Sequence, residues 1–132
     1  VLDVNALARF WTSPLGARIR EAAAMVRREL EFTVRLTPAE LASAGVPVTA
    51  GLGEDEAIVV QGVVDLAVLG PETICVVDFK TDEVTASTVA AKVAAYRPQL
   101  RLYALALERI HGRPVDGAWL HFLATGDTVA GR

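Results

Sequence analysis

A carboxylate and an ammonium group come directly after an apolar run that has the character of a buried strand. The run from Thr73 to Val77 ends in Asp78-Phe79-Lys80. Side chains at positions i and i+2 of a strand share one face, so Asp78 and Lys80 project together while Phe79 turns into the core. The pattern predicts a metal-binding acid beside a charge-stabilising lysine at one edge of a sheet.

A second acid, Asp65, lies on the preceding predicted strand, and a four-residue Gly-Pro turn follows that strand. If the turn closes an antiparallel hairpin with Leu69 opposite Ile74, Asp65 lies opposite Asp78. Such residues have Cβ atoms roughly 4.5–5.5 Å apart. Two carboxylates at that distance repel one another unless a cation lies between them. The alternative is a pair of solvated acids with Lys80 as an ion-pair partner, and the hairpin alone does not decide between them.

Length and composition predict one globular domain. The chain has 132 residues, of which 52% are hydrophobic, so it can build a real core. No apolar run approaches the roughly 20 residues of a membrane span, and no secretory signal pattern is present. The one cysteine, Cys75, excludes a disulfide framework, a cysteine-ligated zinc site and a four-cysteine iron–sulfur cluster within this chain. A reducing, cytoplasmic environment fits this usage.

Charge leaves the partner open. The net charge of −3 is unlike that of a strongly basic DNA-binding domain. Arginine nevertheless dominates the basic residues, and five arginines lie near the start of the chain: Arg9, Arg18, Arg20, Arg27 and Arg28. Local patches of this kind can meet phosphate, although a charged helix face made for solubility is the simpler interpretation of most of them.

The first half of the chain predicts a helix, a strand and an irregular connection. Ser13 followed by Pro14 is typical of a helix start. Apolar residues alternate over 30–36, which predicts a strand with one buried face. Thr37 begins a short helical turn, and a connection rich in Gly, Pro and Ala continues to Glu56.

The second half predicts helices and a last strand after the hairpin. Ser87 can cap a short helix, and Pro98 predicts a break or kink near Arg97, with a second helix from there to about Ile110. A final strand is expected over 118–123. The order predicts an α/β domain with a central mixed four-stranded sheet flanked by helices.

Four segments in order resemble one family: Arg28-Glu29-Leu30-Glu31-Phe32, Gly62-Val63-Val64-Asp65, Asp78-Phe79-Lys80-Thr81-Asp82 and Tyr96-Arg97-Pro98-Gln99-Leu100-Arg101-Leu102-Tyr103. Together they resemble the nuclease domain of the RecB/AddA helicase–nucleases, within the PD-(D/E)xK restriction-endonuclease-like superfamily. The resemblance implies a restriction-endonuclease-like fold and a single nuclease domain over residues 1–132.

The resemblance also implies roles for the clustered residues. Asp65 and Asp78 would bind Mg²⁺ or Mn²⁺, with the backbone carbonyl of Phe79 as a further ligand. Lys80 would orient or activate the attacking water and offset charge on the phosphate. Hydrolysis of a phosphodiester needs oxygen ligands for a hard cation and a fixed positive charge nearby, so the residue types are consistent with these roles.

Three further residues match the family motifs less specifically. Glu29 matches the acid of the first motif, with Glu31 as the neighbour that could be confused with it. Gln99 and Tyr103 lie four apart on one helix face. They would contact DNA phosphate or brace the catalytic residues, although a helix-bracing glutamine and a core tyrosine are the structural alternatives.

One feature departs from the family pattern. RecB/AddA nucleases carry a metal-coordinating histidine on a helix before the first acidic motif, whereas the first histidine here is His111. We therefore expect a C-terminal fragment of a larger helicase–nuclease whose upstream part supplies that residue, or a domain with an incomplete metal site. Both histidines of the chain, His111 and His121, are expected to be structural or exposed. The related iron–sulfur branch would need cysteine ligands from outside this chain.

The resemblance implies a metal-dependent DNA exonuclease domain of an ATP-dependent RecB-like helicase–nuclease in double-strand-break repair and recombination. Its partners would be DNA and a helicase motor, in the same polypeptide or in a partner subunit, with no membrane. The chain has no Gly-x-x-x-x-Gly-Lys-[Ser/Thr] loop, so this piece alone is not expected to hydrolyse ATP. The alternative is a catalytically inactive nuclease-fold module that guides DNA or docks a partner subunit.

Overall fold

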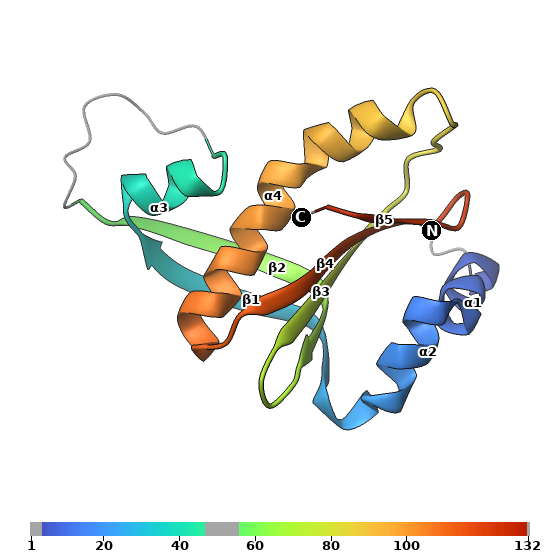
Figure 1. Cartoon of the computed structure of the whole chain (residues 1–132), viewed down its shortest axis with the longest axis horizontal. Helices are drawn as coiled ribbons and strands as arrows, with labels where there is room; N and C mark the ends of the chain where they lie inside the picture. Colours follow the sequence, from blue (N-terminus) through green and yellow to red (C-terminus); the bar gives the residue numbers. More distant parts are fainter. Residues whose placement is uncertain (1–3, 47–55, 132) are drawn as a thin grey trace.

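A twisted sheet with helices on both faces forms the body of the protein in the computed structural model, which describes residues 4–46 and 56–131 (Figure 1). The helices are α1 (Val4–Thr12), α2 (Pro14–Glu21), α3 (Pro38–Ser43) and α4 (Val89–His111), with a 3₁₀ turn at Ala23–Met25. The strands are β1 (Val26–Leu36), β2 (Ile58–Leu69), β3 (Ile74–Lys80), β4 (Val115–Phe122) and β5 (Asp127–Ala130).

The strands lie in the order β1-β2-β3-β4-β5, and only the β3–β4 pair is parallel. The predicted α/β class with a central mixed sheet is therefore confirmed. The predicted number of four strands was wrong, because the described residues form five. The missed strand, β5, is four residues long and largely exposed. Such a short edge strand lacks the alternating apolar pattern by which strands are recognised in a sequence.

The predicted hairpin register is confirmed in β2 and β3. Leu69 lies opposite Ile74, and the antiparallel ladder holds for four residue pairs. The next pair in the same register is Asp65 opposite Asp78. The four-residue turn thus sets which residues meet across the strands.

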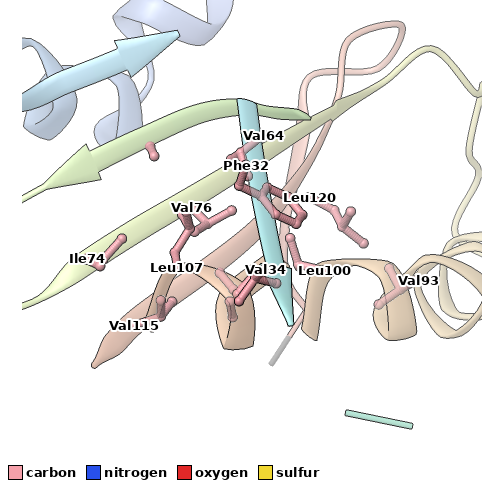
Figure 2. Close-up of a cluster of buried hydrophobic side chains, with 14 of the residues drawn as sticks. Phe32, Val34, Val64, Ile74, Val76, Val93, Leu100, Leu107, Val115 and Leu120 are labelled. Atoms are coloured by element: carbon pink, nitrogen blue, oxygen red, sulfur yellow. The ribbon is translucent and has the colours of Figure 1, made fainter. Parts of the chain in front are cut away.

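The larger core lies between the sheet and α4, as Figure 2 shows. Both Val93 and Leu100 of α4 are buried there. Of the predicted break or kink near Arg97, the break was wrong, because α4 runs unbroken from Val89 to His111 with Pro98 inside it. Proline removes one backbone hydrogen bond from a helix. Burial of apolar side chains on both sides of Pro98 offsets that loss.

The opposite face of the sheet is covered by α1 and α2, which contribute Phe10, Leu15 and Ile19 to a second core cluster. Ser13 caps α2 as predicted, since its hydroxyl accepts a hydrogen bond from the Gly16 N–H at 3.1 Å. A Cβ atom at Gly16 would lie 2.0 Å from a backbone oxygen of α1, so glycine allows the two helices to pack closely.

The predicted helical turn after Thr37 is confirmed as α3, which begins with a reciprocal capping box between Thr37 and Glu40. Most of the irregular connection expected to reach Glu56 lies outside the described residues. Within the described ranges, we find no helix with the length and apolar character needed to cross a membrane.

Candidate active site

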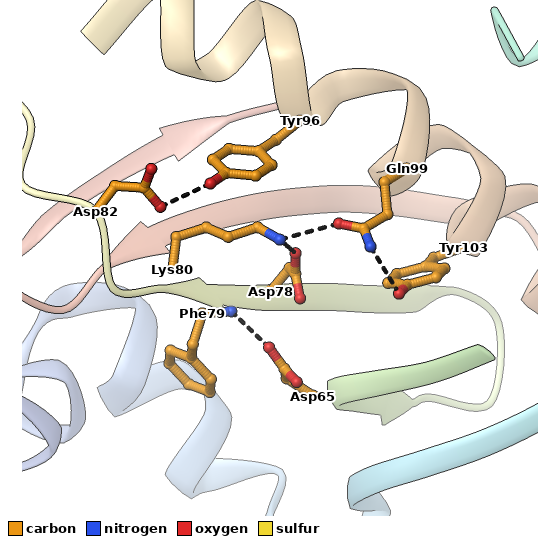
Figure 3. A network of polar contacts seen from close by, with 8 residues as sticks. All are labelled: Asp65, Asp78, Phe79, Lys80, Asp82, Tyr96, Gln99 and Tyr103. Atoms are coloured by element: carbon orange, nitrogen blue, oxygen red, sulfur yellow. Dashed lines mark hydrogen bonds and ion pairs between the residues drawn. The ribbon is translucent and has the colours of Figure 1, made fainter. Parts of the chain in front are cut away.

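The structure brings Asp65 and Asp78 together where the β2–β3 ladder ends (Figure 3). Oδ2 of Asp65 accepts a hydrogen bond from the Phe79 N–H at 2.8 Å. The carboxyl group of Asp78 is close enough to hydrogen-bond to that of Asp65. Asp78 is buried, with 5% of its surface exposed. The pair therefore has the arrangement that the hairpin register predicts.

A local change of strand face places Asp65 at this point. Residues two apart on a regular strand share a face, yet Val64 packs on the α4 side of the sheet and Leu66 on the α1–α2 side. The neighbouring strand is distorted at the same level, where Glu29 has a positive φ of 48°. Asp65 thus lies between the two faces, from where it reaches the backbone of β3.

Lys80 is held from two elements (Figure 3). Its Nζ lies 2.8 Å from Oδ2 of Asp78 and donates a hydrogen bond to Oε1 of Gln99 at 2.9 Å. Nε2 of Gln99 in turn donates to the hydroxyl of Tyr103 at 3.0 Å. Gln99 and Tyr103, four residues apart on α4, therefore lie beside the acids and hold the lysine, and this geometry is consistent with the bracing alternative.

Tyr96 and Asp82, which lie in the family segments but had no predicted role in the site, extend this network: Tyr96 contacts Lys80, and Asp82 contacts Tyr96. Nζ of Lys80 lies 4.1 Å from the centroid of the Tyr96 ring, within range of a cation–π interaction. The Tyr96 hydroxyl donates to Asp82 at 2.7 Å, and Lys92 pairs with the same carboxylate at 3.0 Å. The hydrogen bonds from Tyr96 and Lys92 lower the pKa of Asp82. The available signal was that Tyr96 lies three residues before Gln99, on the same helix face.

The negative charge of Asp78 is unfavourable in this site. Burial, followed by its hydrogen bond with Asp65, raises the pKa of Asp78 to about 6, although the charge of Lys80 acts in the opposite direction. Oδ2 of Asp78 is buried and meets Lys80 without the geometry of a hydrogen bond. One ammonium group therefore does not fully compensate the two acids, so an additional cation would stabilise them.

A cavity of about 560 Å³ opens beside Asp65, between the sheet and α1. Its lining includes Glu29, Phe79 and Thr81. Glu29 and Glu31 are both exposed, but only Glu29 is among the residues that line this cavity. Of the two candidates for the first acidic motif, the structure places Glu29 nearer to the paired acids.

The donor atoms fit a hard, partly hydrated cation. The N–H of Phe79 points to Asp65, and the N–H and C=O of one strand residue point to the same edge, so the carbonyl of Phe79 faces this edge too. Mg²⁺ commonly uses one or two carboxylates and keeps waters or substrate oxygens as its other ligands. Among the described residues, no group of three or more His, Cys, Asp or Glu side chains could hold a metal ion. Asp65 and Asp78 supply two carboxylates, a number that a hydrated divalent cation can use.

Neither histidine joins the acids. His121 is buried on β4, where its Nδ1 lies 2.7 Å from the hydroxyl of Thr128 and its ring packs edge-on against Phe10. His111 is the last residue of α4, and partial burial lowers its pKa. Both positions are consistent with the predicted structural roles.

Comparison with known proteins matches residues 3–129 to the family described as the PD-(D/E)XK nuclease superfamily. The chain is 36% identical over 125 residues to the AddA-type subunit of the ATP-dependent helicase/nuclease from Moorella thermoacetica, covering 95% of this chain and 8% of the relative. The corresponding protein from Carboxydothermus hydrogenoformans is 36% identical over 123 residues, 93% of this chain and 10% of the relative. That from Clostridium acetobutylicum is 32% identical over 128 residues, 97% of this chain and 10% of the relative.

The chain thus spans about a tenth of the length of these relatives. The family match and the similarity to these AddA-type proteins both confirm the resemblance found in the motifs. The mixed sheet with helices on both faces agrees with the restriction-endonuclease-like fold. The chain belongs to the PD-(D/E)XK nuclease superfamily.

Proposed function

We propose that residues 1–132 form a single Mg²⁺-dependent DNA exonuclease domain that hydrolyses phosphodiester bonds. The observation that carries this proposal is the pairing of Asp65 with Asp78 beside Lys80. A scaffold has no need of two facing acids with a raised carboxyl pKa, whereas an enzyme that binds a divalent cation does.

Each residue has a role that its position supports. Asp65, Asp78 and the carbonyl of Phe79 would hold Mg²⁺ or Mn²⁺. The cation would lower the pKa of a coordinated water and stabilise negative charge on the phosphate. Lys80 would offset further charge on the phosphate and orient the water. Glu29, in the wall of the cavity, would be a further catalytic acid.

The bracing residues keep the lysine in place. Gln99 accepts a hydrogen bond from Lys80 and is itself fixed by Tyr103, so the ammonium group is held before substrate arrives. Such preorganisation is a large part of electrostatic catalysis. We therefore assign Gln99 and Tyr103 to positioning rather than to direct contact with DNA.

The relatives' names support a wider setting. They are called helicase/nuclease subunits, so we propose that this domain works with an ATP-driven helicase motor, in the same polypeptide or in a partner subunit. Its substrate would be DNA undergoing double-strand-break repair and recombination in the cytoplasm. The domain would then be the nuclease part of a longer helicase–nuclease.

The test is degradation of end-labelled linear DNA by the full-length protein in Mg²⁺. We expect Asp78→Asn to lower the rate by about 100-fold or more, because the variant loses a charged ligand of the cation. Asp116→Asn removes the same charge from an exposed position on β4 and should cut at the wild-type rate. Equal cutting by wild type and Asp78→Asn would contradict the proposal and favour a module that only guides DNA or docks a partner. Rapid cutting of closed circular DNA would contradict the exonuclease assignment.

A further inference from the structure

Two of the arginines near the start of the chain gather around Trp11. The guanidinium carbon of Arg28 lies 5.1 Å from the centroid of the Trp11 ring, as in a cation–π contact. Nε of Arg20 donates a hydrogen bond to the backbone carbonyl of Trp11 at 2.9 Å. Both arginines are exposed, and Trp11 is half-buried. The indole therefore contacts one accessible guanidinium group, and a second one holds the backbone of the same residue.

This group separates two hollows. Trp11 and Arg28 line the cavity beside Asp65, and they also line a second cavity of about 450 Å³. The second cavity, here called the Trp11 cavity, is lined by Trp11, Ile19, Arg20, Ala23, Val26 and Arg28. A ligand longer than one cavity could thus occupy both by passing over Trp11 and Arg28.

The backbone links this wall directly to the acids. Arg28 pairs with Leu66 across the β1–β2 ladder, and Leu66 follows Asp65 in the chain. Arg28 also precedes Glu29, which lines the cavity beside Asp65. Arg28, which lines the Trp11 cavity, is therefore the chain neighbour of Glu29 and pairs with the chain neighbour of Asp65.

The lining of the Trp11 cavity suits one chemical class. It combines an indole, apolar side chains and two guanidinium groups, and none of the described residues that line it is acidic. The chain as a whole has a net charge of −3, so this local excess of positive charge is not a general property of its surface. A nucleotide offers a flat base for the indole and a phosphate for arginine. The volume is in the range of small-ligand pockets, roughly 300–1,000 Å³.

We propose that Trp11, Arg20 and Arg28 form a subsite for the nucleotide next to the bond that is cut, on a single DNA strand that runs from the Trp11 cavity to Asp65 and Asp78. This inference rests on the proposed nuclease function. Trp11 supplies a stacking surface that tolerates any base, and the arginines hold the adjoining phosphate. The subsite thus sets the register of the strand over the acids without reading its sequence.

The test uses the full-length protein and a short single-stranded oligonucleotide in Mg²⁺. Trp11→Leu removes the stacking surface and should raise KM about tenfold, whereas Trp11→Phe keeps an aromatic ring and should restore most of the affinity. Arg28→Ala should raise KM and weaken its dependence on salt, because one phosphate contact is lost. Arg35→Ala, which removes the same charge from an exposed position at the far end of β1, should leave KM unchanged.

A second measurement does not depend on cutting. An oligonucleotide with photoreactive 5-iodouracil is crosslinked to the Asp78→Asn variant, and we expect the crosslinked peptide to contain Trp11. Crosslinking at Trp11 with no cleavage by the wild type would overturn the nuclease function and leave the subsite standing. Cleavage by the wild type, with unchanged KM in Trp11→Leu and crosslinks elsewhere, would overturn the subsite alone. Loss of thermal stability in both Trp11 variants, with KM unchanged, would show that Trp11 serves only the core.

Discussion

Single residues determine the charge balance of the site. Asp78 is the most strongly perturbed of its acids, because burial and the neighbouring Asp65 raise its pKa more than Lys80 lowers it. Its pKa of about 6 means that at neutral pH the ionised form persists at a cost in free energy. A divalent cation would bind that form and relieve the cost.

The affinity for Mn²⁺ should therefore depend on pH. Below about pH 6 a proton occupies Asp78 in the metal-free protein and competes with the cation, so we expect affinity to fall by about tenfold per pH unit. Above that pH the carboxylate is free, and affinity should level off. Titration calorimetry between pH 5 and 8 measures this, and equal affinity over the whole range would contradict the role of Asp78.

Tyr96 should act on the reaction through Lys80. Tyr96→Phe keeps the ring under the ammonium group and loses only the hydrogen bond to Asp82, so we expect a small fall in kcat, about twofold. Tyr96→Leu removes the cation–π contact, and we expect kcat to fall about tenfold with KM little changed. Steady-state nuclease kinetics separate the two variants, and equal rates would show that the ring does not position Lys80. A melting curve checks that both variants fold.

At the level of helices and strands, the sequence predicted the elements that obey simple periodicity. The β2–β3 register followed from one turn and two apolar runs, so Asp65 and Asp78 could be paired in advance. The change of strand face at Glu29 and Asp65 could not be predicted, because an alternating pattern assumes that successive side chains always point to opposite faces. The contact between Asp82 and Tyr96 joins the end of a strand to a helix and depends on tertiary packing alone.

Helix α4 shows where a local rule yields to packing. Pro98 predicted a break, because a proline inside a helix is unfavourable by about 3 kcal/mol. However, Val93 and Leu100, on either side of the proline, are both buried in the larger core cluster. Because the helix is unbroken, Tyr96, before the proline, and Gln99, after it, both contact Lys80.

Pro98→Ala should therefore stabilise the protein. The substitution restores a backbone N–H in a helix that already forms, and we expect a gain of about 1–3 kcal/mol in the free energy of unfolding. Denaturant unfolding measures this change. Pro114→Ala, at an exposed position between α4 and β4, serves as the control and should gain little. A loss of stability in Pro98→Ala would mean that the ring of Pro98 contributes more to packing than its missing N–H costs.

On the scale of the whole molecule, the site joins the two faces of the sheet. Lys80, Gln99 and Tyr103 belong to the α4 side, whereas the cavity with Glu29 and Trp11 opens toward α1. Asp65 lies between them. A cation that binds there would bind the folded chain and not the unfolded chain, so it would stabilise the fold by mass action.

The pH dependence of stability follows from the same group. Because the pKa of Asp78 is raised in the fold, the folded protein holds this proton more tightly than the unfolded chain does. Its stabilising effect is fully present below pH 3.8, the ordinary pKa of an aspartic acid, and it is lost as the pH rises through about 6. The metal-free protein therefore loses this stability in the same pH range in which we expect a cation to bind.

Calorimetric titration of the metal-free protein with Mn²⁺ at pH 8 tests the shared cation site most directly. We predict one site in the wild type, the same site in Asp116→Asn, and an affinity lower by about 100-fold or more in both Asp65→Asn and Asp78→Asn. Wild-type affinity in either of the last two variants would show that the facing acids do not share a metal ion.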